Sequence, residues 1–326
     1  MRFHLSFVLP LLLSVVMCDT TTLAEDSSEW LPGDADMRKL LGERAVMQFV
    51  WPDQVGPDEP QDHQIAAETV SRGDKPGDFA RISNVTRPTI TVCPPADGSQ
   101  PAGLRPAVIV FPGGGYHILA AEHEGTEVVQ WLNKNGVVGI ILKYRVPRRG
   151  GEFAKHHHAL QDAQRAIGIV RSRAKEWNID PNRIGVLGFS AGGHLAAMLS
   201  NHHQKRSYAR VDESDDASCR PDFAALIYPA YLTEPMESDT PAADVAMDEL
   251  SPKKTPPTFI AVAAEDRFTR GSLVYYAALH KAKVPAELHV YGSGGHGTGL
   301  RVKPLSDWPR ACAEWMQSLQ VRGANK

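Results

Sequence analysis

The strongest constraint on the fold is a regular alternation, from residue 89 onward, of short apolar runs with longer helical segments. The apolar runs are rich in Val, Ile, Phe and Ala, which is typical of strands buried on both faces. They cover residues 107–111, 137–142, 184–189, 224–228, 259–264 and 287–291. Strands that alternate with helices form a largely parallel sheet with helices packed on both faces. The sequence therefore predicts an α/β fold with a mostly parallel central sheet.

Five segments between and after these runs have helical patterns. They cover residues 122–133, 158–177, 191–200, 272–282 and 308–319. We expect Asp180-Pro181 to close the second, because proline interrupts a helix. The one long connection, residues 229–257, carries several prolines and acidic residues, and such connections are usually lids or excursions. It has few large apolar residues, so we expect a solvated rim and no large helical cap.

The string GFSAG at residues 188–192 joins a predicted strand to a predicted helix. A turn of this sharpness crowds the backbone around the serine, so its flanks need residues without a Cβ. The hydroxyl is then exposed above the sheet at a helix N-terminus, where backbone N–H groups favour developing negative charge. This context predicts that Ser190 is a nucleophile.

The string PGGGY at residues 112–116 directly follows the predicted strand 107–111. Three adjacent glycines let backbone N–H groups approach a substrate closely, as an oxyanion hole requires. We expect the amides of Gly114, Gly115 and Ala191 to be the donors, with the choice of glycines left open. A phosphate-binding loop is disfavoured because the Lys-Ser/Thr ending is absent.

A serine nucleophile in this setting needs an acid and then a histidine later in the chain. Asp266 follows the predicted strand 259–264, and His296 lies in a glycine-rich loop after the strand 287–291. Both are loop positions at strand ends, where a rigid scaffold holds catalytic groups. Glu265 is the competitor for the acid. We favour Asp266, because it lies farther past the strand, where the loop turns toward the histidine.

The three histidines at 156–158, with Asp162 one helical turn further on, invite interpretation as a metal site. Three consecutive histidines cannot all face one ion, and no second cluster of ligands accompanies them. We therefore predict no metal and no cofactor. His194, one turn past the nucleophile, is expected to pack or to cap within its helix, and Tyr116 and His117 either pack or line the oxyanion loop.

Together these motifs resemble the α/β-hydrolase carboxylesterases, specifically a secreted bacterial branch similar to acetyl xylan esterases and other carbohydrate deacetylases. The matching strings are PGGGY at 112–116, DAQRA at 162–166, GFSAGGH at 188–194, YPAY at 228–231, PPTF at 256–259 and GGHG at 294–297. The resemblance implies the α/β-hydrolase fold and a Ser190, Asp266 and His296 triad. Pro112 stands where hormone-sensitive-lipase-like esterases carry a histidine, which argues against that subgroup.

The N-terminus has the pattern of a secretory signal peptide. Arg2 and His4 precede an apolar run at 7–17 that is too short to span a bilayer, and small residues allow cleavage after Ala24. We therefore expect a secreted or periplasmic protein without an integral membrane segment. Lipid anchoring at Cys18 stays open as the weaker alternative.

The 326 residues suit one large α/β domain. We expect a signal peptide at 1–24, an N-terminal arm of extended or turning chain at 25–80, and the catalytic domain at 81–326. Cys93, Cys219 and Cys312 lack metal-ligand spacing and are expected to be buried, with at most one disulfide among them.

The expected activity is hydrolysis of short-chain esters, chiefly acetyl, on carbohydrate such as acetylated xylan. The first alternative is an exopeptidase related to the prolyl oligopeptidase catalytic domain, which needs a pair of glutamates such as Glu122 and Glu124 or Glu234 and Glu237. The second is a non-catalytic binding protein, disfavoured because all three triad residues are present. The 35 basic and 38 acidic residues give a net charge of −3, which disfavours a nucleic-acid partner. The oligomeric state stays open.

Overall fold

The computed structural model describes residues 30–60, 65–75, 78–96 and 103–323. The chain divides into two units, Met1–Trp30 and the compact unit Leu31–Lys326, which holds the elements named here. The predicted signal peptide and Cys18 lie outside the described residues. None of the helices in the described ranges has the length and apolar character that crossing a membrane requires.

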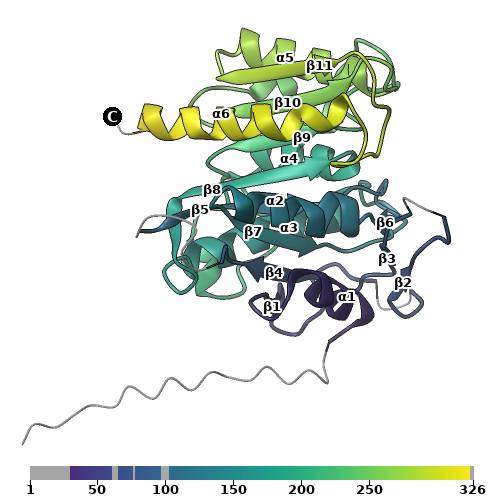
Figure 1. Ribbon diagram of the computed structural model, residues 1–326, viewed down its shortest axis with the longest axis vertical. Helices are drawn as coiled ribbons and strands as arrows, with labels where there is room; N and C mark the ends of the chain where they lie inside the picture. The colour runs from purple at the N-terminus through teal and green to yellow at the C-terminus, as the bar shows by residue number, and fades with distance from the viewer. Residues whose placement is uncertain (1–29, 61–64, 76–77, 97–102, 324–326) are drawn as a thin grey trace, which may run out of the picture. The chain divides into compact units, whose positions relative to one another are not determined.

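The core of the unit is an eight-stranded sheet with the order β1-β4-β7-β5-β8-β9-β10-β11 (Figure 1). Only the β1/β4 and β4/β7 pairs are antiparallel, which confirms the predicted, mostly parallel sheet. The strands are Val46–Phe49, Thr89–Cys93, Val138–Lys143, Arg105–Phe111, Ile179–Phe189, Ala224–Ile227, Thr258–Ala263 and Ala286–Tyr291 in that order. A small antiparallel sheet contains β2 (Thr69–Ser71), β3 (Arg81–Ser83) and β6 (Ile118–Leu119).

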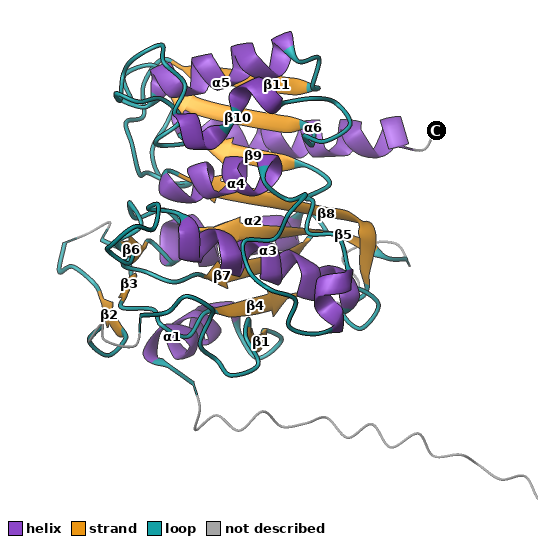
Figure 2. Cartoon of the chain, turned by 180° about the vertical axis from the view of Figure 1, so that it is seen from behind, coloured by secondary structure: helices purple, strands orange, loops and turns teal. Residues whose placement is uncertain are grey.

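Helices cover both faces of the sheet, as predicted (Figures 1 and 2). One face carries α2 (Glu127–Lys134) and α6 (Trp308–Gly323), whose Trp131 and Trp308 rings lie 5.2 Å apart. The other face carries α3 (His157–Ser172), α4 (Ala191–Asn201) and α5 (Thr269–Lys281). The strands β4, β7, β9 and β10 are buried along their whole length, which explains the continuous apolar runs, whereas the edge strands β1 and β11 are partly exposed.

The predicted end of the second helix was wrong. α3 ends at Ser172, and Asp180-Pro181 lies inside β8 instead of closing the helix. β8 tolerates the proline because its register against β5 shifts there, from the pair Arg105↔Ile179 to the pair Ala107↔Ile184. Proline has no amide hydrogen to donate and is accommodated at such irregularities.

Residues 25–80 were expected to be extended or turning chain, but their described part includes α1 (Pro32–Leu41) and the edge strand β1. Pro32 at the first helical position starts α1 without losing a hydrogen bond. The segment is held by buried charges, because Lys143 Nζ of β7 lies 2.7 Å from Asp34 and 2.9 Å from Glu68. The described residues from Leu31 to Ala80 are thus part of the folded unit.

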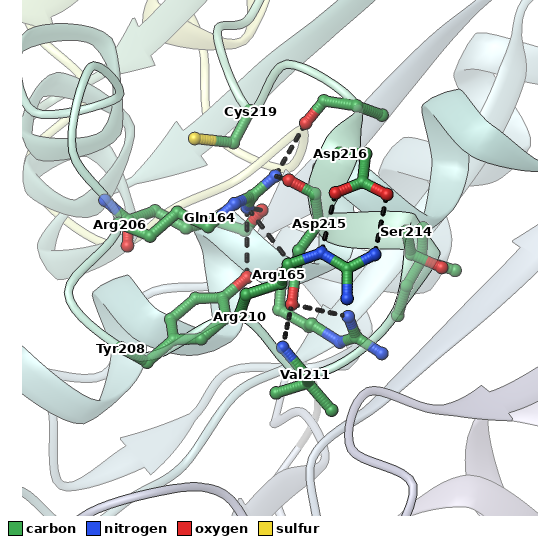
Figure 3. Close-up of polar contacts among 12 residues, drawn as sticks. Gln164, Arg165, Arg206, Tyr208, Arg210, Val211, Ser214, Asp215, Asp216 and Cys219 are labelled. Atoms are coloured by element: carbon green, nitrogen blue, oxygen red, sulfur yellow. Dashed lines mark hydrogen bonds and ion pairs between the residues drawn. The ribbon is translucent and has the colours of Figure 1, made fainter.

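The connection between α4 and β9, residues 202–223, is fixed onto α3 by a network around Asp215 (Figure 3). Asp215 accepts hydrogen bonds from the Tyr208 hydroxyl at 2.7 Å and the Val211 amide at 2.9 Å. Arg165 of α3 completes the network with a 3.0 Å ion pair to the same carboxylate. The connection 202–223 is therefore held against α3 by this network.

The segment 229–257 contains only two short 3₁₀ helices, Ala243–Val245 and Met247–Glu249, so the expected absence of a large cap agrees with the described residues. Leu232, Val245 and Leu250 are buried against the main domain, whereas most of its acidic side chains are exposed. The segment therefore forms a polar rim.

The strand register brings the functional loops to one edge of the sheet. Phe111 pairs with Gly188, Phe189 with Ile227, Ile227 with Ala261, and Ala263 with Tyr291. These pairs lie at the carboxyl ends of β5, β8, β9, β10 and β11, so the loops that follow all emerge together. In open α/β sheets this edge is where ligands bind.

Candidate active site

Ser190 occupies a sharp turn between β8 and α4. Its φ of 51° and ψ of −116° are unusual for a residue with a side chain, and such strain is concentrated at functional sites. A Cβ on Gly192 would lie 2.0 Å from the carbonyl oxygen of Phe111, so only glycine lets α4 start this close to β5. The local geometry therefore has the form that the GFSAG string predicts.

The structure brings the three predicted triad residues together. Ser190 Oγ lies 2.8 Å from His296 Nε2, and His296 Nδ1 lies 2.7 Å from Asp266 Oδ2. The Asp266 side chain is fully buried, whereas that of His296 is 27% exposed. When Nδ1–H donates to Asp266, the Nε2 lone pair faces the serine hydroxyl and is able to take its proton.

The two candidate acids have different partners. Asp266 Oδ2 lies 2.7 Å from His296 Nδ1, and Asp266 Oδ1 accepts a hydrogen bond from the Phe268 amide at 2.9 Å. Glu265 instead accepts the amides of Gly294 and Gly295 at 3.0 and 3.1 Å. The glutamate thus supports the backbone of the loop that carries the histidine, and the aspartate contacts the imidazole.

The PGGGY loop lies beside the serine. Gly114 has a φ of 132°, and a Cβ there would lie 2.0 Å from the Ile118 carbonyl oxygen. Within the described ranges, the amides of Gly114 and Gly115 donate to no protein group. Ala191 is the first residue of α4, where amides have no intrahelical acceptor. All three predicted donors are therefore unused by the backbone, as an oxyanion hole requires.

The remaining glycine of the loop is held by a residue that the sequence analysis did not assign to the active site. Gly113 donates its amide to Glu124 Oε2 at 2.8 Å, and the Tyr228 hydroxyl donates to Glu124 Oε1 at 2.8 Å. Tyr228 in turn accepts the amide of Gly299 at 2.8 Å. Glu124 lies in a buried π-helical turn, Glu122–Thr126, an element frequent at functional sites.

Tyr228 has a second role beside the histidine, because its ring centroid lies 5.0 Å from that of His296. Burial raises the pKa of the Tyr228 hydroxyl far above its ordinary value, so it stays protonated and able to donate to Glu124. The YPAY string at 228–231 was the available signal in the sequence. Only the fold shows that the Tyr228 ring lies edge to face beside the His296 imidazole.

Aromatic side chains pack beside the His296 ring. The Phe268 ring lies 4.9 Å from the His296 ring, and the Tyr231 ring lies 5.8 Å from that of Phe268. Tyr116 is buried and its hydroxyl contacts His194 Nδ1 at 2.9 Å, so it packs beneath the loop, and His117 is exposed.

The histidine run does not converge on Asp162. His157 Nε2 and His158 Nε2 contact Asp58, at 2.8 Å to its carboxylate and 2.9 Å to its carbonyl oxygen. Asp162 accepts the indole N–H of Trp51 and pairs with the Arg145 guanidinium. His156 lies beside Asp244 instead, with its Nδ1 3.4 Å from Asp244 Oδ2.

The three cysteines within the described ranges, Cys93, Cys219 and Cys312, are buried and unpaired, so no disulfide joins them. This agrees with their expected role as small buried side chains. Burial raises the pKa of the Cys93 and Cys219 thiols, which keeps them in the unreactive form.

Two protein-family models match the chain. A family described as BD-FAE matches residues 94–227, and one described as alpha/beta hydrolase fold matches residues 230–300. The chain is 30% identical to an acetylxylan esterase of Xylanibacter ruminicola, over 60% of this chain and 41% of that protein. It is 28% identical to endo-1,4-beta-xylanase B of Butyrivibrio fibrisolvens, over 68% of this chain and 37% of that protein. The chain thus spans about two fifths of these curated relatives.

Solved structures are also similar to this chain. The acetyl ester-xyloside bifunctional hydrolase from Caldicellulosiruptor lactoaceticus is 31% identical, with a TM-score of 0.66. The match covers 85% of this chain and 97% of that one.

Proposed function

Because the chain belongs to the α/β-hydrolase fold family of carboxylesterases, we propose that it is a serine esterase that removes short acyl groups, chiefly acetyl, from carbohydrate such as acetylated xylan. The observation that carries the proposal is the pair of contacts made by His296: Nε2 lies 2.8 Å from Ser190 Oγ, and Nδ1 lies 2.7 Å from Asp266 Oδ2.

The first half-reaction forms an acyl-enzyme. Ser190 Oγ attacks the ester carbonyl carbon while His296 Nε2 takes the hydroxyl proton, and the carbonyl oxygen becomes an oxyanion. The unused amides of Ala191, Gly114 and Gly115 stabilise that charge. The intermediate then breaks its bond to the sugar oxygen, which leaves as an alcohol after His296 returns the proton.

The second half-reaction releases the acid. Water attacks the acyl carbon while His296 accepts its proton, and the second tetrahedral intermediate expels Ser190 Oγ, which regains the proton from the imidazole. Asp266 holds the imidazole in the required tautomer throughout. Each cycle consumes one water and yields one carboxylic acid and one alcohol.

Two features support a carbohydrate acetyl ester as substrate. The names of the similar proteins are acetylxylan esterase and acetyl ester-xyloside hydrolase. The 229–257 segment has mostly exposed acidic side chains and only two short 3₁₀ helices, which suits a small acyl group on a bulky, polar carrier. Export by the segment 1–24 is part of this proposal, and N-terminal sequencing of the protein recovered from outside the cytoplasm tests it.

Replacing Ser190 with Ala tests the proposal directly. We expect kcat for p-nitrophenyl acetate to fall on the order of 10³-fold or more, with an unchanged melting temperature. A fluorophosphonate probe should label the unaltered protein and leave Ser190→Ala unlabelled. Near-full activity of the variant would overturn the assignment of the nucleophile.

Of the two glutamate pairs named for the exopeptidase alternative, Glu122 and Glu124 are already engaged, whereas Glu234 and Glu237 are exposed on the 229–257 segment. Glu122 pairs with Arg72 and Arg301, and Glu124 is buried and bonded to Gly113 and Tyr228. These two glutamates therefore do not offer a free pair for a substrate amine. Parallel assays of acetate release from acetylated xylo-oligosaccharides and amine release from aminoacyl amides separate the two activities, and failure of the probe to label Ser190 would favour a non-catalytic protein.

A further inference from the structure

A second cluster of chemically active side chains lies apart from the triad. It contains His156, which directly precedes α3, His194 of α4, and Asp244 of the 3₁₀ helix Ala243–Val245. One nitrogen or oxygen of each residue lies within 4.8 Å of those of the other two. Three elements that are distant in the sequence therefore direct their polar atoms to one point.

The histidine nitrogens in this cluster lack hydrogen-bond partners among the described residues. His194 is completely buried, and its Nε2 is unpartnered. His156 is 7% exposed, and its Nδ1 is also without a hydrogen bond, although Asp244 Oδ2 lies 3.4 Å away. Leaving a buried polar group unsatisfied is destabilising. Two such buried, unpartnered nitrogens on residues of one cluster point to a bound ligand.

The second nitrogen of His194 is already used. His194 Nδ1 lies 2.9 Å from the Tyr116 hydroxyl oxygen. A histidine that binds a metal commonly donates its other N–H to an oxygen, which fixes the ring and directs the free lone pair at the ion. When Nδ1–H donates to Tyr116, His194 Nε2 presents its lone pair to the cluster.

The donor set suits a transition metal. Two imidazoles and one carboxylate are ligands that Zn²⁺ accepts, at about 2.0–2.1 Å for nitrogen, which makes the edge of a tetrahedral site about 3.3–3.4 Å. The distance of 3.4 Å between His156 Nδ1 and Asp244 Oδ2 matches that edge.

The surroundings hold the cluster in place and leave it accessible. His202 Nε2 donates to the Asp244 carbonyl oxygen at 2.8 Å, and Asn201 donates to that of Val245 at 2.8 Å. A surface hollow of about 580 Å³ is lined by His156 and Asp244 together with Arg206 of the connection shown in Figure 3. An ion can enter there, and a water molecule can complete the coordination.

We propose that His156, His194 and Asp244 form a binding site for one divalent transition-metal ion of the Zn²⁺ type. The ion would tie the 229–257 segment to α3 and α4 and, through the Tyr116 hydroxyl, support the base of the oxyanion loop. It takes no part in acyl transfer, so the site stands independently of the proposed esterase activity.

The test is calorimetric titration of chelator-treated protein with ZnCl₂, together with visible spectra after addition of CoCl₂. We expect one ion per chain, a rise in melting temperature with Zn²⁺, and the d–d absorption of tetrahedral Co²⁺. Asp244→Asn keeps the shape of a side chain that is one-third exposed, and it should weaken Zn²⁺ binding on the order of 10²-fold.

Asp248→Asn is the matched control, because this exposed acid lies on the same segment outside the cluster, and it should bind Zn²⁺ as the unaltered protein does. His156→Ala should lose the Co²⁺ spectrum. Absence of saturable Zn²⁺ binding by the unaltered protein, or equal affinity in Asp244→Asn and Asp248→Asn, would overturn the proposal.

Discussion

The Tyr228 hydroxyl lies 2.8 Å from Glu124 Oε1, and through this hydrogen bond the loop that carries His296 is joined to the loop that carries the oxyanion glycines. Glu124 binds Gly113 with its other oxygen, and Tyr228 accepts the amide of Gly299. One buried carboxylate therefore sets the distance between the general base and the oxyanion donors.

Glu124→Gln should separate this positioning role from a purely structural one. The amide places N–H donors against either the Gly113 amide or the Tyr228 hydroxyl, so one of the two loops shifts. We expect kcat for p-nitrophenyl acetate to fall on the order of 10²-fold with little change in KM, because misplacement of about 1 Å has that effect. Equal kcat in the variant, or a change in KM alone, would contradict the role.

Asp266→Asn and Glu265→Gln form a matched pair for the acid. Loss of the Asp266 charge leaves the imidazole in the wrong tautomer, and a loss of about 10⁴-fold in kcat is expected by analogy with other triads. Glu265 contacts only loop amides, so its amide variant should lose less than about tenfold. Reversal of this ranking in steady-state assays would transfer the role of the acid to Glu265.

Acyl-chain preference tests the absence of a long apolar channel. Each methylene removed from water contributes about 0.8 kcal/mol, so enzymes that prefer long chains need an extended apolar surface. The segment 229–257 provides exposed acids instead, and its large apolar side chains are mostly turned into the core. We expect kcat/KM for p-nitrophenyl esters to be highest for acetate and to fall about tenfold or more by octanoate. A preference for octanoate would favour a lipase-like function.

Mild acid should destabilise the protein through buried neutral histidines. Burial lowers the pKa of His123 and His158 in the folded state, whereas in the unfolded chain they titrate near about 6.5. Below that pH the unfolded state binds more protons than the folded state, so the free energy of unfolding falls as the pH falls.

Urea denaturation between pH 7.5 and 5 measures this effect, with a slope of at most about 1.4 kcal/mol per pH unit for each histidine. The carboxylates with lowered pKa titrate below this window. For example, the hydrogen bond from Arg165 lowers the pKa of Asp212 to about 2. His123→Gln should reduce the slope. A free energy of unfolding that is constant over this range would contradict the prediction.

The sequence by itself determined the features that depend on short segments. The apolar runs predicted six of the eight strands in the main sheet, because strands buried on both faces cannot contain many polar residues. The strings GFSAG and PGGGY identified the turn at Ser190 and the glycine loop, because close backbone approach demands glycine within a few positions. The chain order of serine, acid and histidine identified the three residues Ser190, Asp266 and His296.

Only the tertiary structure decided which distant groups meet. The sequence analysis placed neither β1 nor β4, because edge pairing depends on a partner strand elsewhere in the chain. Glu124 and Glu122 are equivalent glutamates in the sequence, yet one binds Gly113 and Tyr228 and the other pairs with surface arginines. The order of the strands and the packing of helices bring such groups together across more than a hundred residues, and local patterns carry no information about that distance.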